Sequence, residues 1–157
     1  MLIKDIVREL DGVGCDGVKI GDPNKEVTKI AVTMWATPRV IQRAAELGAN
    51  LIITHEPTFY TDADAARDNP VDKLKLELIK KADVVICRYH TKMHRITPDL
   101  SPTGALYYLG LGGKLEPTEY FGSSIFTSDE PISANEMAVL IRERLGVKHI
   151  RIAGNGD

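Results

Sequence analysis

Two short apolar runs, each followed by a histidine, constrain the fold of this 157-residue chain most strongly. The first lies within residues 49–54 and leads into His55 and Glu56, and the second lies within residues 83–89 and leads to His90. Apolar runs of this length, bounded by turn residues, favour buried strands. In α/β proteins, ligands gather at the carboxyl ends of such strands. We therefore expect the two histidine-bearing ends to lie at one edge of a sheet.

The sequence before and between these runs predicts helices that join parallel strands. Residues 27–33 alternate and are rich in β-branched side chains, which favours a further strand. Thr37 and Pro38 suit an N-cap and a first helical residue, and Asn69 and Pro70 repeat that signal. Strands and helices in this order predict βαβ units. We therefore predict an α/β fold with a mixed or mostly parallel sheet flanked by helices.

Shorter elements surround this pattern. An amphipathic helix is predicted over residues 2–10, and a loop rich in glycine over residues 12–23. Residues 91–102 contain two prolines and are predicted as a loop, followed by a brief helix over residues 103–111.

The sequence changes character after three glycines near residue 112. We expect a strand over residues 119–127, a helix that opens with a capping box at Ser133, and a final strand over residues 149–153. The chain is therefore predicted to have two parts. We expect residues 1–112 to form an α/β domain that contains both histidine-bearing ends, and residues 113–157 to form an α+β segment that belongs to an inserted or second domain.

Charge and composition argue against several classes of function. The formal net charge of −2 gives no bulk attraction to nucleic acid or to an anionic membrane. Cys15 and Cys87 form no paired motif, and no apolar run is long enough to span a membrane. The N-terminal residues lack the pattern of a secretion signal, so we expect a cytoplasmic protein.

His55 and Glu56 are the first candidates for a metal site. Neighbouring residues on a strand face opposite sides, so the two side chains converge only if the strand ends between them, as Pro57 favours. An imidazole and a carboxylate suit zinc, manganese or iron, and a carboxylate can bridge two ions. The alternative is that His55 hydrogen-bonds a loop and that Glu56 is solvated.

His90, His94 and Asp99 extend this candidate site. The spacing of His90 and His94 places two imidazoles on one side of a turn, and Asp99 follows in the same segment. Together with His55 and Glu56 they would supply nitrogen and oxygen ligands for one or two divalent ions. The alternative is that His90 is a core histidine or one that orients a ligand. If the protein is an enzyme, metal-dependent hydrolysis is the expected chemistry, with His90 and Asp99 as catalytic residues that orient ligands or move protons.

Four other side chains near these ends have two interpretations each. Arg88 and Lys92 could hold a phosphate or form a solvated rim. Trp35 and Phe59 could wall a pocket or belong to the core. The sequence contains no glycine-rich phosphate motif and no serine nucleophile elbow.

A resemblance to a known family rests on three segments, Thr37-Pro38, Gly48–Pro57 and Tyr89–His94. They resemble the NGG-one-interacting-factor-three-like proteins, a dinuclear metal-centre family also described as GTP cyclohydrolase I type 2-like. Its typical Thr-His-His-Pro motif is here Thr-His-Glu-Pro, and its typical His-Thr-x-x-Asp motif ends here in histidine. By position, the resemblance implies metal ligands at His55, Glu56 and His94, with His90 nearby.

The resemblance also implies a self-associating protein that forms a toroidal homo-hexamer. The family supplies a further histidine and glutamate from a longer chain, so we expect this sequence to be an N-terminal portion. The predicted function is that of a divalent-metal-dependent hydrolase acting on a small, nucleotide-like molecule. The alternative is a metal-stabilised binding or scaffold protein without turnover, which forms a ring-shaped oligomer.

Overall fold

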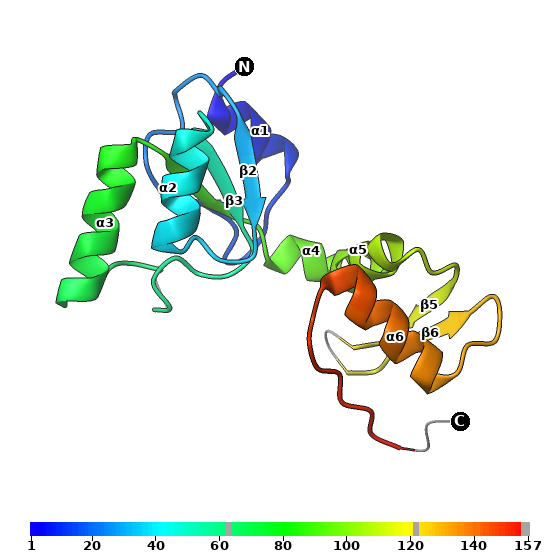
Figure 1. The fold of residues 1–157 in the computed structure, drawn as a ribbon. Helices are drawn as coiled ribbons and strands as arrows, with labels where there is room; N and C mark the ends of the chain where they lie inside the picture. The colour runs from blue at the N-terminus through cyan, green and yellow to red at the C-terminus, as the bar shows by residue number, and fades with distance from the viewer. Residues whose placement is uncertain (62–63, 121–122, 155–157) are drawn as a thin grey trace. The chain divides into compact units, whose positions relative to one another are not determined.

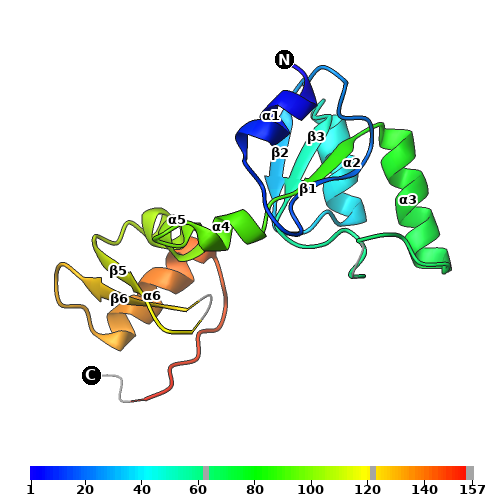
Figure 2. The ribbon, with the colours of Figure 1, turned by 180° about the vertical axis from the view of Figure 1, so that it is seen from behind.

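A computed structural model describes residues 1–61, 64–120 and 123–154 of the chain. The chain forms two compact units, the first from Met1 to Lys92 and the second from Met93 onward. Figures 1 and 2 show the elements of each unit from opposite sides. The predicted domain boundary at residue 112 stays a prediction.

The first unit contains a four-stranded sheet in the order β1-β4-β3-β2. Its strands are β1 (Gly17–Ile20), β2 (Ile30–Thr33), β3 (Leu51–Thr54) and β4 (Val85–Arg88). The last three are mutually parallel, whereas β1 is antiparallel to β4. Helices α2 (Pro38–Glu46) and α3 (Pro70–Ala82) connect the parallel strands, and α1 (Ile3–Glu9) precedes them. The predicted α/β class with a mostly parallel sheet is therefore confirmed.

The two connecting helices begin where their capping residues predict. The hydroxyl oxygen of Thr37 accepts a hydrogen bond from the amide of Val40 at 3.2 Å, and proline follows as the first helical residue. The side-chain oxygen of Asn69 accepts one from the amide of Asp72 at 2.9 Å, again with proline next. Each cap satisfies an amide that has no partner within its own helix.

Helices cover both faces of the sheet (Figures 1 and 2). Because side chains alternate along a strand, Ile52 and Ile86 face α2 and α3, whereas Leu51 and Val85 face α1. All four of these side chains are fully buried. This double coverage explains why β3 and β4 read as continuous apolar runs.

The parallel strands end level with one another, and this alignment positions the candidate site. Thr54, the last residue of β3, pairs with Thr33 of β2 on one side and with Arg88 of β4 on the other. Its buried hydroxyl lies 3.1 Å from two backbone carbonyl oxygens, those of Met34 and Glu56. The chain therefore leaves β3 and β4 at one edge of the sheet, as predicted.

Two sequence predictions near the sheet are wrong. The glycine-marked loop of residues 12–23 contains β1, whose four residues are too few to stand out among the glycines. The predicted loop of residues 91–102 begins with helix α4 (Thr91–Arg95) and ends in α5 (Leu100–Leu109). The start of α4 depends on contacts with distant parts of the sequence, which local patterns do not reveal.

The second unit combines helices with a two-stranded antiparallel sheet. Strand β5 (Gly113–Pro117) pairs with β6 (Ser124–Ser128), and α6 (Ala134–Leu145) follows with the predicted capping box at Ser133. The expected strand over residues 119–127 is thus confirmed only from Ser124, and residues 121–122 within it lie outside the described residues. The described residues 149–153 form no strand, so that prediction is wrong. Neither β5 nor β6 pairs with this segment, and a strand needs such a partner.

The helices are short. The longest that the structure describes is α3, with 13 residues, whereas a helix needs about 20 apolar residues to span a bilayer. Within the described parts of the chain, none is both long and apolar enough to cross a membrane.

The carboxylate of Asp72 stabilises the first unit, and this stabilisation is lost in acid. The Arg67 side chain donates two hydrogen bonds to it, at 2.8 and 3.3 Å, and the Arg67 amide donates a third. These hydrogen bonds lower the pKa of Asp72 to about 2, and those from the Arg67 side chain have the largest effect. Because this folded-state pKa lies below the ordinary value near 4, the stabilisation is fully present above about pH 4 and is lost as the pH falls towards about 2.

We therefore expect an Asp72→Asn variant to lose stability less steeply than the wild type between about pH 4 and pH 2. Urea unfolding at a series of pH values measures this slope. Asp68→Asn is a matched control, because Asp68 is 89% exposed and forms an ion pair with the exposed Lys73 at the start of the same helix. Equal slopes for wild type and Asp72→Asn would contradict the prediction.

Candidate metal centre

The backbone of His55 is held at the end of β3 from two sides. Its amide donates a hydrogen bond to the carbonyl oxygen of Thr33 at 3.1 Å, which extends the β2–β3 ladder by one residue. Its carbonyl oxygen accepts a hydrogen bond from Nε of Arg88 at 3.2 Å. Arg88, a candidate phosphate ligand from the sequence, therefore contacts the backbone that carries His55.

The chain supplies two more histidines where it leaves β4. His90 directly precedes α4, and His94 lies within this helix. A separation of four residues is about one helical turn, so both side chains lie on the same face. Helix α4 begins with the last two residues of the first unit and continues past Lys92. One turn of its backbone therefore connects His90 to His94.

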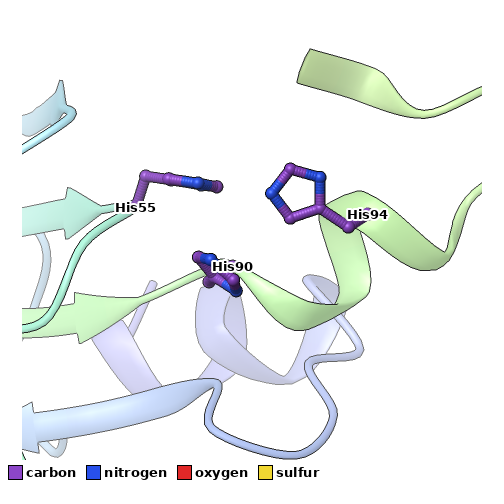
Figure 3. A group of neighbouring side chains, drawn as sticks. All are labelled: His55, His90 and His94. Carbon is purple, nitrogen blue, oxygen red and sulfur yellow. The ribbon is translucent and has the colours of Figure 1, made fainter. Parts of the chain in front are cut away.

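His55, His90 and His94 form the group that could hold a metal ion. One ring nitrogen from each lies within 4.8 Å of those of the other two, and all three residues are partly buried. The ring centroids of His55 and His90 are 4.4 Å apart at an interplanar angle of 34°. Figure 3 shows the three imidazoles converging from the end of a strand and from the start of a helix.

Asp99 orients one member of this histidine group. Its Oδ2 lies 2.7 Å from Nδ1 of His94, and both side chains are mostly buried, at 11% and 18% exposure. With the carboxylate ionised, Nδ1 carries the proton and donates. The other ring nitrogen of His94 faces His55 and His90 (Figure 3). A carboxylate that fixes the tautomer in this way is the usual partner of a metal-binding histidine.

Glu56 is not a member of the described group. Its amide donates to the carbonyl oxygen of Met34 at 2.9 Å, and its own carbonyl oxygen accepts from the hydroxyl of Thr54. The backbone is thus still tied to the strand ends at this residue, and neighbouring strand residues point to opposite sides. The structure brings together His55, His90 and His94, and Asp99 contacts the ring of His94. The ligand and catalytic roles of all five residues stay predictions.

The donor atoms of the histidine group fit a transition-metal ion. Imidazole nitrogen suits zinc, iron, copper and nickel, whereas manganese prefers oxygen ligands. Three protein ligands also match a catalytic zinc site, in which a fourth position stays available for water or substrate. The histidine group could therefore hold a metal ion.

The sequence analysis missed Asp16, which contacts this site. Its carboxylate accepts hydrogen bonds from the backbone amides of His90, Thr91 and Lys92. The partners are at least 74 positions apart in the sequence. A single aspartate in a glycine-rich loop gives no local signal for such a contact.

An aromatic cavity lies beyond the ends of β2 and β3. It has a volume of about 270 Å³, and its lining includes Trp35, Phe59, Tyr60 and Lys75. Nε1 of Trp35 donates a hydrogen bond to the hydroxyl of Tyr60. Phe59 is buried and also belongs to the core, while Trp35 is 49% exposed. Both interpretations of Phe59 therefore hold, and Trp35 is a pocket residue.

A smaller cavity of about 160 Å³ lies within the second unit. His94 and Asp99 line it together with the hydroxyl-bearing residues Thr97, Thr118 and Ser123. Polar groups thus surround the position where His94 and Asp99 meet.

Comparison with known proteins gives matches over most of the chain. Residues 6–157 match the family Duf34/NIF3 (NGG1p interacting factor 3). A GTP cyclohydrolase 1 type 2 homolog of Clostridium perfringens is 28% identical over 172 residues, which cover 98% of this chain and 62% of that protein. Another, of Lactococcus lactis, is 32% identical over 99 residues, which cover 62% of this chain and 37% of that protein. The chain thus spans less than two thirds of the length of these relatives.

Solved structures share the fold. A hypothetical protein of Staphylococcus aureus matches with a TM-score of 0.75 at 18% identity, covering 99% of this chain and 68% of that one. Reduced HcgD from Methanocaldococcus jannaschii matches with a TM-score of 0.68 at 19% identity, covering 91% and 60%. The resemblance drawn from the sequence motifs is confirmed, and the chain belongs to the Duf34/NIF3 (NGG1p interacting factor 3) family.

Proposed function

We propose that this protein binds a divalent metal ion, with zinc favoured, through His55, His90 and His94, and that it hydrolyses a small, nucleotide-like molecule there. The convergence of three imidazole nitrogens within 4.8 Å carries the proposal. When bound, such an ion supplies a Lewis acid that lowers the pKa of water and polarises the bond to be hydrolysed.

The chain's own residues would hold this site in a competent arrangement. Asp99 keeps the proton of His94 on Nδ1, which leaves Nε2 with the lone pair that a metal requires. Arg88 fixes the backbone of His55 through its carbonyl oxygen. The backbone of His55 and the ring of His94 are thus held by neighbouring side chains, and ligands fixed in advance lower the cost of binding.

The cavities support a small substrate. The aromatic cavity measures about 270 Å³, close to the lower end of the roughly 300–1,000 Å³ that small-molecule pockets span. The cavity beside His94, at about 160 Å³, would hold only part of a nucleotide-like molecule. Trp35 and Tyr60 offer aromatic faces on which a flat base could stack. The names of the curated relatives, GTP cyclohydrolase 1 type 2 homologs, suggest a nucleotide for those proteins.

Metal content is the first test. After dialysis against Zn²⁺ and removal of free ion, the wild-type chain should retain about one Zn²⁺ per molecule, as a three-histidine site predicts, measured by plasma mass spectrometry. His55→Ala and His94→Ala should retain much less, while His149→Ala, at an exposed histidine outside the group, should match the wild type. Equal metal content in all four proteins would refute the proposed site. Release of product from nucleotides, with and without a chelator, then tests hydrolysis.

The second candidate is a metal-stabilised scaffold that forms a ring-shaped homo-oligomer without turnover. Strand β2 supports self-association, because it is an edge strand with apolar side chains exposed, Ile30 at 45% and Val32 at 79%. Sedimentation with and without Zn²⁺ separates the two candidates. Metal-dependent assembly with no product from any nucleotide would favour the scaffold.

A further inference from the structure

We infer that Asp16 is a positioning residue for the histidine group, because it anchors the turn of backbone from which His90 and His94 project. This inference rests on the proposed metal-binding function. It assigns a role to a residue of the loop before β1, outside the predicted ligand set. Asp16 acts on the backbone that carries the histidines and not on the metal or the substrate.

Both carboxylate oxygens of Asp16 take part in this anchor. Oδ1 accepts from the amides of His90 and Thr91, at 2.7 and 2.8 Å. Oδ2 accepts from the amide of Lys92 at 2.8 Å and from that of Val13, in its own loop, at 3.1 Å. One carboxylate therefore joins its loop to three consecutive residues of the histidine-bearing turn.

Helix α4 needs such an external anchor. It has five residues, far fewer than the roughly 12–15 that make an isolated helix even marginally stable in water. Its first amides have no acceptor within the helix, and Asp16 supplies that acceptor from elsewhere in the chain. Hydrogen bonds to an ionised group are roughly twice as strong as neutral ones. The carboxylate can therefore fix both the position and the direction of the turn.

A second contact ties the same two segments together. Sγ of Cys15 lies 3.0 Å from the hydroxyl oxygen of Thr91. Gly14 packs so closely against Thr91 that an added Cβ would lie 3.3 Å from its side chain, and the residue has a φ of +61°. The loop and the turn thus fit closely, and Asp16 provides their charged connection.

The state of the carboxylate suits this role. Burial raises the pKa of Asp16, but the amide hydrogen bonds from His90, Lys92, Val13 and Thr91 together outweigh burial, and the pKa is lowered overall. The side chain is therefore an ionised acceptor at neutral pH.

The test compares Asp16→Ala, Asp16→Asn and Asp11→Asn with the wild type. Asp11 lies in the same loop, is 78% exposed and pairs with the side chain of Lys92, so its variant removes a nearby charge but leaves the amide anchor. Asparagine at position 16 keeps one acceptor oxygen of two and guards against a failure of the alanine variant to fold. Two measurements are made on each protein: titration with Co²⁺ followed by visible absorption, and amide hydrogen exchange of the metal-free chain.

We expect Asp16→Ala to bind Co²⁺ about 10–100-fold more weakly than the wild type, as the loss of a supporting partner of a metal ligand does. Its Co²⁺ spectrum should change in shape, and the amides of His90, Thr91 and Lys92 should lose protection from exchange. Asp16→Asn should fall between, and Asp11→Asn should match the wild type.

The outcomes separate this inference from the proposed function. A wild-type chain that binds Co²⁺, with Asp16→Ala and Asp16→Asn equal to it in affinity and spectrum, overturns the positioning role alone. An equal loss in Asp11→Asn also overturns it, because loop charge would then explain the effect. A wild-type chain that binds no Co²⁺ overturns the proposed function and, with it, any role of Asp16 toward a metal.

Discussion

A His90→Ala variant should bind Zn²⁺ more than about 100-fold more weakly than the wild type. Loss of a residue that only supports a metal ligand costs about 10–100-fold in affinity, and loss of a ligand itself should cost more. The structure places the imidazole of His90 in the group with His55 and His94. Competition with a chromophoric zinc chelator measures the affinity of the variant against that of the wild type.

Glu56→Gln is the informative comparison, because the family motif and the structure disagree about whether Glu56 or His90 is a metal ligand. Family position implies Glu56 as a ligand and leaves His90 nearby, whereas the described group contains His90 and not Glu56. We therefore expect Glu56→Gln to keep an affinity close to that of the wild type. A large loss in Glu56→Gln together with a small one in His90→Ala would show that the family arrangement applies instead.

An Ile86→Ala variant should lower the free energy of unfolding of the first unit by about 2–5 kcal/mol, the usual cost of truncating a buried isoleucine. Ile86 is fully buried and lies on β4, which pairs with a strand on each side. Neighbours on both strands limit how far the sheet can move to fill the cavity. Urea unfolding followed by the fluorescence of Trp35 reports on this unit, because Trp35 is the chain's single tryptophan.

Val32→Ala is the control for this experiment. Val32 lies on the edge strand β2 and is 79% exposed, so its truncation removes little buried surface. Its effect should stay within about 0.5 kcal/mol, as for most surface substitutions. Similar losses in the two variants would show that β4 is not the centre of the core.

Local signals in the sequence predict much of the first unit. Thr37 with Pro38, and Asn69 with Pro70, mark the starts of α2 and α3 because capping depends on neighbouring residues alone. The runs that become β3 and β4 are recognisable because both of their faces are buried. Because β3 and β4 are parallel, their carboxyl ends lie at one edge of the sheet, and the sequence alone therefore predicts that His55 and His90 follow strands at that edge.

What the sequence does not reveal depends on contacts between distant segments. Helix α4 lies where prolines favour a loop, and it is held by Asp16 from far along the chain. Strand β1 forms among glycines because β4 offers it a partner. Residues 149–153 have a strand-like composition but form no strand, because neither β5 nor β6 pairs with them. The choice between Glu56 and His90 depends on the directions of side chains at a strand end, which spacing cannot give.

The parallel pairing of β3 with β4 has a consequence for the order of folding. His90 and His94 are local neighbours, but His55 joins them only after α3 has closed the crossover between the strands. That closure costs chain entropy before any long-range contact repays it. The complete histidine group is thus a property of the native chain. An ion bound to this group would stabilise the folded state, and the stabilisation would rise with the logarithm of the free ion concentration once the site is saturated. Such an ion would not nucleate folding, as an ion bound to a short local loop can.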